Sequence, residues 1–527
     1  MYKYEYDLSV AQVFERAYKR NPAKEVIFDR TRRMTYEELW NESRYVAAAL
    51  RDLNVGKGDK LAVCLPNWHE FVVVYLAAAF LGAVIVPCNT RYQQHEVEYI
   101  LTNSGAKIAF CTKEFSGVPH ADQFTQAKNM VNSLNQIVSV RFEQEGLISY
   151  QRLIERGKNS LFVPEDIQPK DDVFAILYTS GTTGRPKGAM LTHSNIAHTG
   201  TISAEAMKCA PEDVFLIAVP VFHVFGITPS ILSTFACAGS MVLVDQYKAK
   251  DVLELIQQER VTVHNGVPTM FILELNHPDF ASFDLSSLRT GIIAAAPCPV
   301  EVVKRIRSEM GCNIVVAYGL TETSPTLTIT DFNDDDMIRS ETVGKVLPGA
   351  EVKIVDPRRV PVGPGVVGEL ACRGFGVMKG YYNMPEATQA AIHQEGWFYS
   401  GDLATMDEQG YIRIVGRIKE MIIRGGYNIY PREIEEILYG HPSVMEAAVV
   451  GLPDTVLGEI SCAAIRVRSG EQLQTEEIKN YIKSKVADYK VPDKFVFVDA
   501  LPMTASGKIK KIDLQQQLKT ELEDQLR

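Results

Sequence analysis

The alternation of helical and strand-like segments along most of the chain constrains its fold more than any other feature. Residues 36–53 place apolar side chains on one helical face and are followed by an apolar segment at 61–65 that is typical of a buried strand. The same order recurs at 96–104 and 107–110, and again at 251–259 and 262–264. Because strands that alternate with helices pair in parallel and are covered by helices on both faces, the sequence predicts an α/β fold.

The pattern changes after about residue 342. Short strand candidates at 351–355, 368–373 and 411–415 are separated by turns, such as DEQG at 407–410. This spacing is typical of antiparallel strands, so we expect a β-rich subdomain to follow the parallel sheets.

A last unit begins near residue 416 and mixes both kinds of signal. We expect a helix at 431–438, a strand at 446–451 and a second helix at 475–489, whose apolar residues recur at helical spacing. A chain of 527 residues is expected to form more than one folding unit. There is no long linker, so the boundary of the last unit should be a tight one, at about 417–420.

Charge and composition exclude several classes of protein. A formal net charge of −10 argues against a nucleic-acid-binding surface. The nine cysteines form no CxxC pair, and their odd number suits no disulfide framework, so we expect reduced thiols in a cytoplasmic protein. The start, MYKYEYDLSV, lacks the pattern of a signal peptide. The uncharged run at 71–86 is interpreted as a buried helix and strand, not as a transmembrane segment.

The most informative motif follows the strand-like segment 173–177 and reads YTSGTTGRPKG at 178–188. Its glycines let backbone N–H groups approach an anion, its hydroxyls donate hydrogen bonds, and Lys187 adds a positive charge. It is not the GxxxxGK[ST] pattern, because no Ser or Thr follows the lysine. Alone, the motif is compatible with a phosphate-binding loop and with a flexible surface loop.

Three weaker motifs follow. YGLTETS contains Glu322, a carboxylate of the kind that Mg²⁺ prefers, and Tyr318, a flat ring for a purine. YSGDL contains Asp402, which can accept hydrogen bonds from two ribose hydroxyls, with Arg417 as a further donor. PMTASGK ends in Lys508 near the C-terminus. Each of these alone is also typical of a solvated turn or strand end.

Together and in this order, the motifs resemble the adenylate-forming (ANL) superfamily of acyl-CoA synthetases, luciferases and peptide-synthetase adenylation domains. The resemblance covers residues from about 35 to 508 and includes PVFHVFG and GRIKEMIIRGGYNIYPREIE at 220–226 and 416–435. Within the superfamily, YGLTETSP, IIRGGYNIYP and SGKIKK are most similar to medium- to long-chain fatty acyl-CoA ligases.

This resemblance implies both architecture and reaction. It implies a large N-terminal domain of βα-layered sheets plus a β-rich subdomain at 1–417, which binds AMP and the acyl group. A small mobile α+β C-terminal lid domain at 418–527 would swing about Lys419 between two half-reactions. A fatty acid and ATP would give acyl-AMP and pyrophosphate, and the thiol of CoA would then give acyl-CoA and AMP, with Mg²⁺ as the metal. A homodimer is left open.

The resemblance also implies roles for particular residues. The β and γ phosphates of ATP would be wrapped by Thr179, Ser180, Gly181, Thr182, Thr183, Gly184, Arg185, Pro186 and Lys187. The rest of the nucleotide site would comprise Ala295, Ala296, Pro297, Tyr318, Gly319 and Thr321 around the adenine, and Asp402 and Arg417 at the ribose. Thr179 and Glu322 would bind Mg²⁺. Lys419, Gly425 and Gly426 complete the set, the glycines as a route for the pantetheine arm.

The predicted catalytic residues are Lys508, Glu322, Thr179 and His223. Lys508 would touch the α-phosphate and the attacking carboxylate. The substrate carboxylate is already ionised, so the site must supply positive charge and alignment rather than a general base. His223 would gate or shape the acyl site, although a half-buried structural imidazole is an alternative. Amino-acid-activating relatives usually carry an Asp near this position, so His223 disfavours an amino-acid substrate.

Several alternatives remain open. An aryl-CoA ligase differs from a fatty acid:CoA ligase only in pocket shape, which the sequence does not define. An acyl-AMP ligase that loads a carrier protein usually has an inserted segment, and none is seen between 342 and 417. A luciferase-type oxygenase lacks support, because the chain ends in EDQLR. A non-catalytic nucleotide-binding protein would be free to lose Lys508, Glu322 or Asp402.

Overall fold

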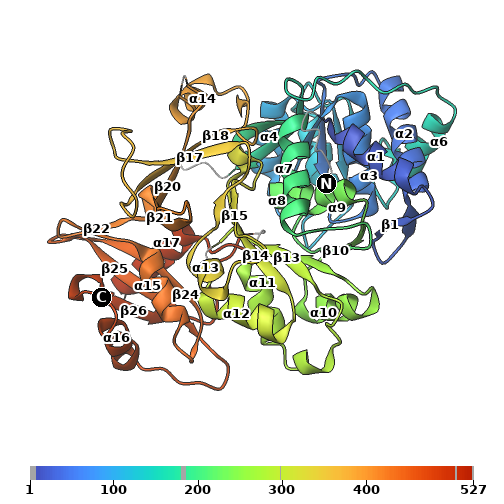
Figure 1. The fold of residues 1–527 in the computed structure, drawn as a ribbon. Helices are drawn as coiled ribbons and strands as arrows, with labels where there is room; N and C mark the ends of the chain where they lie inside the picture. Colours follow the sequence, from blue (N-terminus) through green and yellow to red (C-terminus); the bar gives the residue numbers. More distant parts are fainter. Residues whose placement is uncertain (1–7, 180–185, 297, 394, 505–506, 525–527) are drawn as a thin grey trace.

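The computed structural model describes residues 8–179, 186–296, 298–393, 395–504 and 507–524 (Figure 1). In these residues the strands form four sheets. The first has the order β19 (Gly380–Tyr381), β9 (Lys187–Thr192), β8 (Val173–Thr179), β4 (Val84–Pro87), β3 (Lys60–Cys64), β5 (Ile108–Cys111), β6 (Gln136–Ser139) and β7 (Ile148–Ser149). Strands β8 to β7 in this order pair in parallel, as predicted, whereas β9 and β19 are antiparallel additions at one edge.

The second sheet has the order β16 (Lys345–Val346), β15 (Thr328–Ile329), β14 (Asn313–Tyr318), β13 (Thr290–Ile293), β12 (Val263–Asn265), β10 (Val214–Ile217), β11 (Ser240–Leu243), β1 (Glu25–Phe28) and β2 (Arg33–Thr35). Its centre, from β14 to β1, is also parallel. The accompanying helices are α1 (Val10–Arg20), α2 (Tyr36–Asp52), α3 (His69–Leu81), α4 (Gln94–Ser104), α5 (His120–Lys128), α6 (Tyr150–Lys158), α7 (His193–Ala206), α8 (Val224–Gly226), α9 (Ser233–Cys237), α10 (Ala249–Gln258), α11 (Pro268–Leu275), α12 (Val300–Glu309) and α13 (Asp336–Glu341).

Helix α3 shows how the core of this part is built. Every residue of the helix is buried, and it shares one apolar cluster with strands of both large sheets. A helix that is apolar on all sides is stable only inside a protein core or a membrane. It ends at Gly82, whose φ of 64° is left-handed and suits a residue without a Cβ. No helix in the described ranges has the length and apolar character needed to cross a bilayer.

The β-rich part is antiparallel throughout, as predicted. Its sheet has the order β17 (Ala350–Val355), β18 (Gly368–Gly374), β20 (Phe398–Met406) and β21 (Ile412–Arg417). Helix α14 (Pro385–Ala391) precedes β20. The chain then passes through a 3₁₀ turn at Ile418–Glu420 into the fourth sheet.

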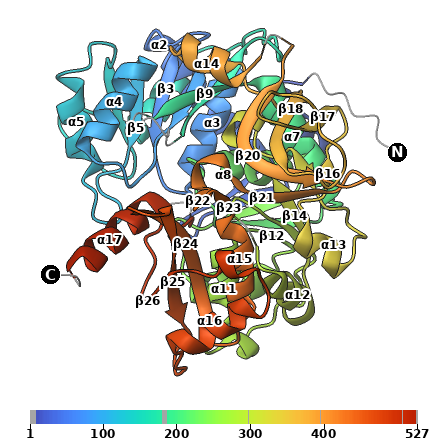
Figure 2. The same ribbon diagram turned by 90° about the vertical axis from the view of Figure 1, so that its left-hand side faces the viewer.

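The fourth sheet and its helices form a separate, smaller unit with apolar clusters of its own. The sheet has the order β23 (Tyr427–Ile429), β22 (Ile422–Arg424), β25 (Gly458–Val467) and β24 (Val444–Asp454), with β26 (Lys494–Phe497) beside β25; the helices are α15 (Pro431–Tyr439), α16 (Thr475–Lys483) and α17 (Lys511–Asp524). Figure 2 shows this unit beside α11 and α12 of the larger part. The α/β architecture with a separate C-terminal unit agrees with the expectation from the sequence.

One predicted helix is too long. We expected 475–489 to be helical throughout, but α16 ends at Lys483 and a 3₁₀ turn follows at Asp488–Lys490. Val486 and Tyr489 still pack against the apolar cluster of the C-terminal unit, although they lie outside α16. The apolar spacing therefore predicted correctly which residues are buried, but it predicted a helix that is longer than the one observed.

Candidate active site

Lys508 comes from the C-terminal unit and lies among residues of the larger part. The carbonyl oxygen of Gly507 accepts a hydrogen bond from Oγ1 of Thr269 in α11, at 3.3 Å. A Cβ at position 507 would lie 2.9 Å from the side chain of Val267, and φ is 77°, so both space and conformation favour glycine there. The glycine before Lys508 thus allows the loop to approach α11 closely.

The ammonium group of Lys508 has an unusual electrostatic environment. Burial, together with the positive charge of Arg417, lowers the pKa of Lys508 from 10.5 to about 8, although Asp402 and Glu322 act in the opposite direction. These three groups come from the predicted ribose and metal sites. The fold therefore brings four of the predicted residues close enough to influence one another electrostatically.

Asp402 is the centre of the predicted ribose site, and it is 3% exposed. Its Oδ1 lies 2.9 Å from Nε of Arg417, and its Oδ2 accepts a 2.6 Å hydrogen bond from the hydroxyl of Tyr318. Burial raises the pKa of Asp402, although Arg417 and Tyr318 oppose that shift. Strand pairing explains the geometry, because Asp402 and Arg417 are cross-strand partners in β20 and β21.

The structure adds a role for Tyr318 that the sequence did not indicate. We predicted it as a flat surface for adenine, and its hydroxyl also orients the carboxylate of Asp402. Burial raises the pKa of Tyr318 well above 10, so the phenol stays a donor. Gly319 follows at the end of β14, where a Cβ would lie 1.5 Å from the carbonyl oxygen of Pro325, which excludes any larger residue.

Glu322 lies in a 3₁₀ turn, Thr321–Thr323, directly after β14. It is 9% exposed, its Oε1 accepts a 2.8 Å hydrogen bond from the hydroxyl of Tyr381, and its backbone oxygen accepts one from the N–H of Met378. The other predicted metal ligand, Thr179, ends β8 and donates through Oγ1 to the backbone oxygen of Lys187 at 3.4 Å. A carboxylate and a hydroxyl are hard oxygen donors, so this pair fits Mg²⁺ that is also bound to substrate phosphates.

The predicted phosphate loop joins two paired strands. Thr179 and Lys187 are opposite each other at the ends of β8 and β9, and Ser180 to Arg185 between them lie outside the described residues. The hydroxyl of Tyr99 donates to the carbonyl oxygen of Pro186 at 2.8 Å. The ammonium of Lys187 lies 5.1 Å from the ring centre of Tyr381. The ends of the loop are therefore anchored by the sheet and by two tyrosines.

The alanine-rich segment carries backbone strain. It follows β13, and Ala295 adopts a φ of 74°, in the left-handed region that costs about 1 kcal/mol or more for residues with a Cβ. A glycine would adopt this φ at a lower cost, because it has no Cβ. Ala296 continues the same turn, and Pro297 lies outside the described residues.

His223 stands just before α8. Its Nδ1 accepts a 3.2 Å hydrogen bond from the N–H of Phe225. Burial and, to a smaller extent, the charge of Lys508 lower the pKa of His223 to about 3. The imidazole is therefore neutral at physiological pH, which suits a residue that shapes the acyl site better than one that carries charge there.

No sequence motif indicated the residue that holds the segment leading to His223. The side-chain amide of Asn67 donates to the carbonyl oxygens of Ile217 and Val219, at 3.0 Å each, and its Oδ1 accepts from the N–H of Val221. Asn67 lies between β3 and α3, whereas its partners belong to the segment that leads to His223. Only the fold brings these two segments together.

Two predicted glycines and the predicted hinge residue belong to the segment that follows β21. Gly425 and Gly426 form the turn between β22 and β23, with φ values of 56° and 86°. Two successive positive φ values are typical of a tight hairpin turn that favours glycine. Gly425 donates to the carbonyl oxygen of Leu457 in the same unit. Lys419 lies exposed in the Ile418–Glu420 turn.

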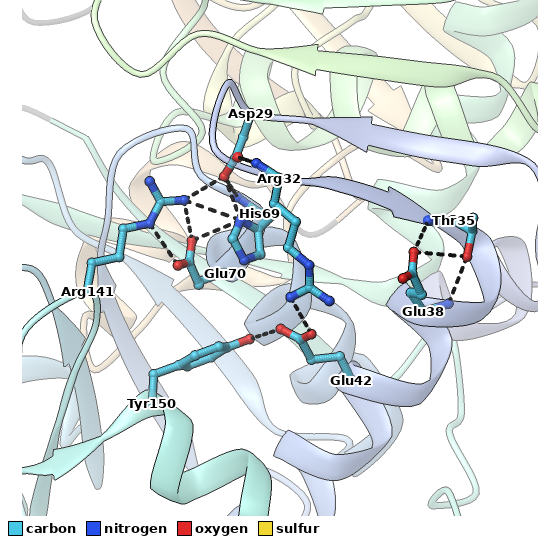
Figure 3. A network of polar contacts seen from close by, with 9 residues as sticks. All are labelled: Asp29, Arg32, Thr35, Glu38, Glu42, His69, Glu70, Arg141 and Tyr150. Carbon is cyan, nitrogen blue, oxygen red and sulfur yellow. Dashed lines mark hydrogen bonds and ion pairs between the residues drawn. The ribbon is translucent and has the colours of Figure 1, made fainter.

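A buried ionic network lies elsewhere and was also missed (Figure 3). His69 showed no metal-ligand spacing in the sequence, but the fold places its Nδ1 2.6 Å from Asp29 and 3.4 Å from Glu70. The guanidinium of Arg141 lies among them, 2.5 Å from Asp29 and 2.8 Å from Glu70. Burial is the largest single influence on the pKa of Asp29 and raises it, but the interactions with His69 and Thr31 together outweigh burial and leave the pKa lowered. Arg141 thus supplies the positive charge that balances the two carboxylates.

Known proteins resemble this chain over nearly its whole length. The family model for AMP-binding enzymes matches residues 14–382, and the model for the AMP-binding enzyme C-terminal domain matches residues 433–508. A Bacillus subtilis (strain 168) protein that is named as an acyl-CoA synthetase, YngI, is 42% identical over 522 residues, which cover 93% of this chain and 92% of that protein.

Two further relatives differ in the acids that their names mention. The human mitochondrial medium-chain acyl-CoA ligase ACSF2 is 35% identical over 542 residues, which cover 98% of this chain and 88% of that protein. The crystal structure of the anthranilate CoA ligase AuaEII in complex with anthranoyl-AMP has a TM-score of 0.90 and 26% identity, and covers 98% of this chain and 99% of that one.

Proposed function

The chain belongs to the family of AMP-binding enzymes, and from that premise we propose that it activates a fatty acid as an acyl-adenylate and transfers the acyl group to CoA. It is an AMP-forming acid–CoA ligase that uses ATP, Mg²⁺ and CoA. Our proposal concerns the acid, the residues that act on it and the movement between the two steps.

The position of Lys508 carries this proposal. In the first step, a carboxylate oxygen of the fatty acid attacks the α-phosphorus of ATP, and the bond to the leaving pyrophosphate breaks. Negative charge accumulates around the α-phosphate, where Lys508 would act, and the electrostatic influence of Arg417, Asp402 and Glu322 on Lys508 supports this placement. Preorganised positive charge at such a point stabilises the transition state more than it stabilises the substrates. When bound, Mg²⁺ supplies further positive charge at the phosphate oxygens.

The second step requires a different arrangement. The sulfur of CoA attacks the acyl carbon, the thiol loses its proton, and AMP leaves. We propose that the C-terminal unit turns about Lys419, withdraws Lys508 and presents the Gly425–Gly426 turn to the pantetheine arm. The loop meets α11 through a hydrogen bond to the backbone of Gly507 and through close packing beside Val267, contacts that can break and re-form when a lid moves, and this supports the proposal.

Two observations support an aliphatic acid. The named medium-chain relative is 35% identical, whereas the anthranilate ligase is 26% identical. His223 is neutral and lies beside buried apolar residues, Val224 and Phe225, which suits an uncharged chain. An aryl acid is the second candidate, because the closeness of the fold to the anthranilate ligase, with a TM-score of 0.90, favours it.

Steady-state AMP release tests the proposal. The enzyme is assayed with ATP and Mg²⁺ on acetate, octanoate, palmitate and benzoate, with and without CoA. We expect CoA-dependent turnover that peaks on an aliphatic acid. A peak on benzoate would establish the aryl candidate instead, and pyrophosphate release without stimulation by CoA would indicate a carrier protein as the acyl acceptor.

The compartment can be tested separately. All nine cysteines are free, and eight of them are buried, which supports our proposal of a reducing compartment such as the cytoplasm. A fluorescent fusion expressed in the source cell checks this directly. Signal confined to another compartment would contradict it.

A further inference from the structure

Tyr381 contacts both sides of the predicted metal and phosphate site. Its hydroxyl donates to Oε1 of Glu322 at 2.8 Å, and its ring centre lies 5.1 Å from the ammonium of Lys187. Tyr381 is 8% exposed. A single buried side chain therefore bridges the predicted metal ligand and the predicted phosphate lysine.

The backbone around Tyr381 holds it in this position. Tyr381 pairs with Ala189 of β9, two residues after Lys187. On the other side, the N–H of Met378 donates to the backbone oxygen of Glu322 at 2.9 Å. Residues 378–382 thus form a strap that is fastened to the Glu322 turn at one end and to the phosphate-loop strand at the other.

We propose that Tyr381 is a positioning residue that holds the Glu322 carboxylate in the orientation that binds the cation of the ATP complex. This inference rests on the proposed function, because it takes Glu322 as a ligand of Mg²⁺. With Oε1 engaged by the phenol, the carboxylate cannot rotate freely, and Oε2 is the oxygen presented to the cation. A group that orients a metal ligand in this way typically changes metal affinity by about 10- to 100-fold when it is removed.

Binding of Mn²⁺ in the presence of α,β-methylene-ATP tests this without any turnover. Free Mn²⁺ is measured by electron paramagnetic resonance during titration of the full chain. Tyr381→Phe keeps the ring beside Lys187 and removes only the hydroxyl, so we expect Mn²⁺ affinity to fall about 10-fold. Affinity for the nucleotide analogue in EDTA should stay within about 2-fold, because the ring and Lys187 remain in place. Tyr382→Phe is the matched control, because the ring of Tyr382 faces Lys60 rather than Glu322, and its affinity for Mn²⁺ should not change.

A double-mutant cycle separates the assignment of Glu322 as a metal ligand from the positioning role of Tyr381. Glu322→Gln should weaken Mn²⁺ binding, and Tyr381→Phe added to it should produce no further loss, because the hydroxyl acts through Glu322. If Tyr381→Phe binds Mn²⁺ as tightly as the wild type while Glu322→Gln binds it more weakly, the role of Tyr381 is overturned and the metal assignment of Glu322 stands. An unchanged Glu322→Gln would overturn the metal assignment and this inference with it. An equal loss in Tyr382→Phe would show that general packing is responsible, which also overturns the inference.

Discussion

The two sides of the candidate active site are held in place in different ways. Asp402 and Arg417 are cross-strand partners in one antiparallel sheet, and the hydroxyl of Tyr318, at the end of β14 in another sheet, fixes the carboxylate. Lys508 instead arrives on a loop of the C-terminal unit, and among the described residues a hydrogen bond from Thr269 to Gly507 links this loop to α11. A single hydrogen bond contributes about 1 kcal/mol net, whereas displacing a paired strand breaks several. The difference supports our proposal that the nucleotide side stays in place while Lys508 leaves between the two steps.

Removal of the mobile lysine is the strongest test of this contrast. In Lys508→Ala the charge at the α-phosphate is lost, and we expect pyrophosphate release from ATP and acid to fall about 100- to 1000-fold. Thioester formation from synthetic acyl-AMP and CoA, measured by chromatography, should stay within about 3-fold, because Lys508 is withdrawn in that step. An equal loss of both half-reactions would contradict the proposed exchange of the two states.

Removal of a fixed contact should behave differently. Tyr318→Phe deletes the 2.6 Å hydrogen bond to Asp402, so the ribose carboxylate loses a donor. Hydrogen bonds to charged groups are worth about 1.5–3 kcal/mol, so we expect KM for ATP to rise at least 10-fold. KM for synthetic acyl-AMP in the second step should rise by a similar factor, since the same ribose is bound in both steps. A defect limited to the first step would show that Tyr318 belongs to the mobile side.

The pH dependence distinguishes the same two sides. The pKa of Lys508 is lowered to about 8, so its ammonium is lost at a lower pH than an ordinary lysine would lose it. We expect kcat/KM for ATP in the first half-reaction to fall about 10-fold per pH unit above about 8, since this parameter reports the free enzyme. Lys508→Arg should move that fall to higher pH, because a guanidinium stays charged. The second half-reaction should show no such fall. If both steps had the same pH profile, deprotonation of Lys508 would be excluded as the cause of the fall in kcat/KM.

The Gly425–Gly426 turn can be tested with a substitution that keeps its backbone conformation but narrows the proposed path of the pantetheine arm. Gly426 has a φ of 86°, and a Cβ there would meet no atom within 4 Å. Asn tolerates positive φ, so Gly426→Asn should change the melting temperature little. If the pantetheine arm passes this backbone, thioester formation should fall about 10-fold or more while pyrophosphate release is retained. Wild-type synthesis of acyl-CoA would mean that Gly426 is needed only for the hairpin.

The smallest expected effect concerns strain on the fixed side. Ala295 has a φ of 74°, so Ala295→Gly should relieve a left-handed conformation and stabilise the protein by about 0.5–1 kcal/mol. Thermal denaturation measures this. A lower melting temperature would indicate that the Ala295 methyl group packs favourably enough to offset the strain.

Much of the site could be predicted, because its motifs are local. Thr179, Glu322, Asp402 and Lys508 each lie in a short segment whose residue types suit one part of a nucleotide, and resemblance to a family supplied their order. Their assigned roles remain predictions. No local pattern indicated the roles of Tyr381, Asn67 or His69, because their partners are distant in the sequence. Tyr381 is 59 residues from Glu322, Asn67 is 154 residues from Val221, and His69 is 40 residues from Asp29.

The sequence by itself determined where helices and strands form, since apolar spacing is set by neighbours along the chain. It was less reliable on where elements end, as α16 shows, because the same spacing also arises when irregular turns are buried. Only the tertiary structure decided that Tyr318 donates to Asp402, that Tyr381 joins Glu322 to Lys187, and that Lys508 lies near Arg417. Such contacts depend on how sheets stack and where two units meet, and a local pattern contains no information about either.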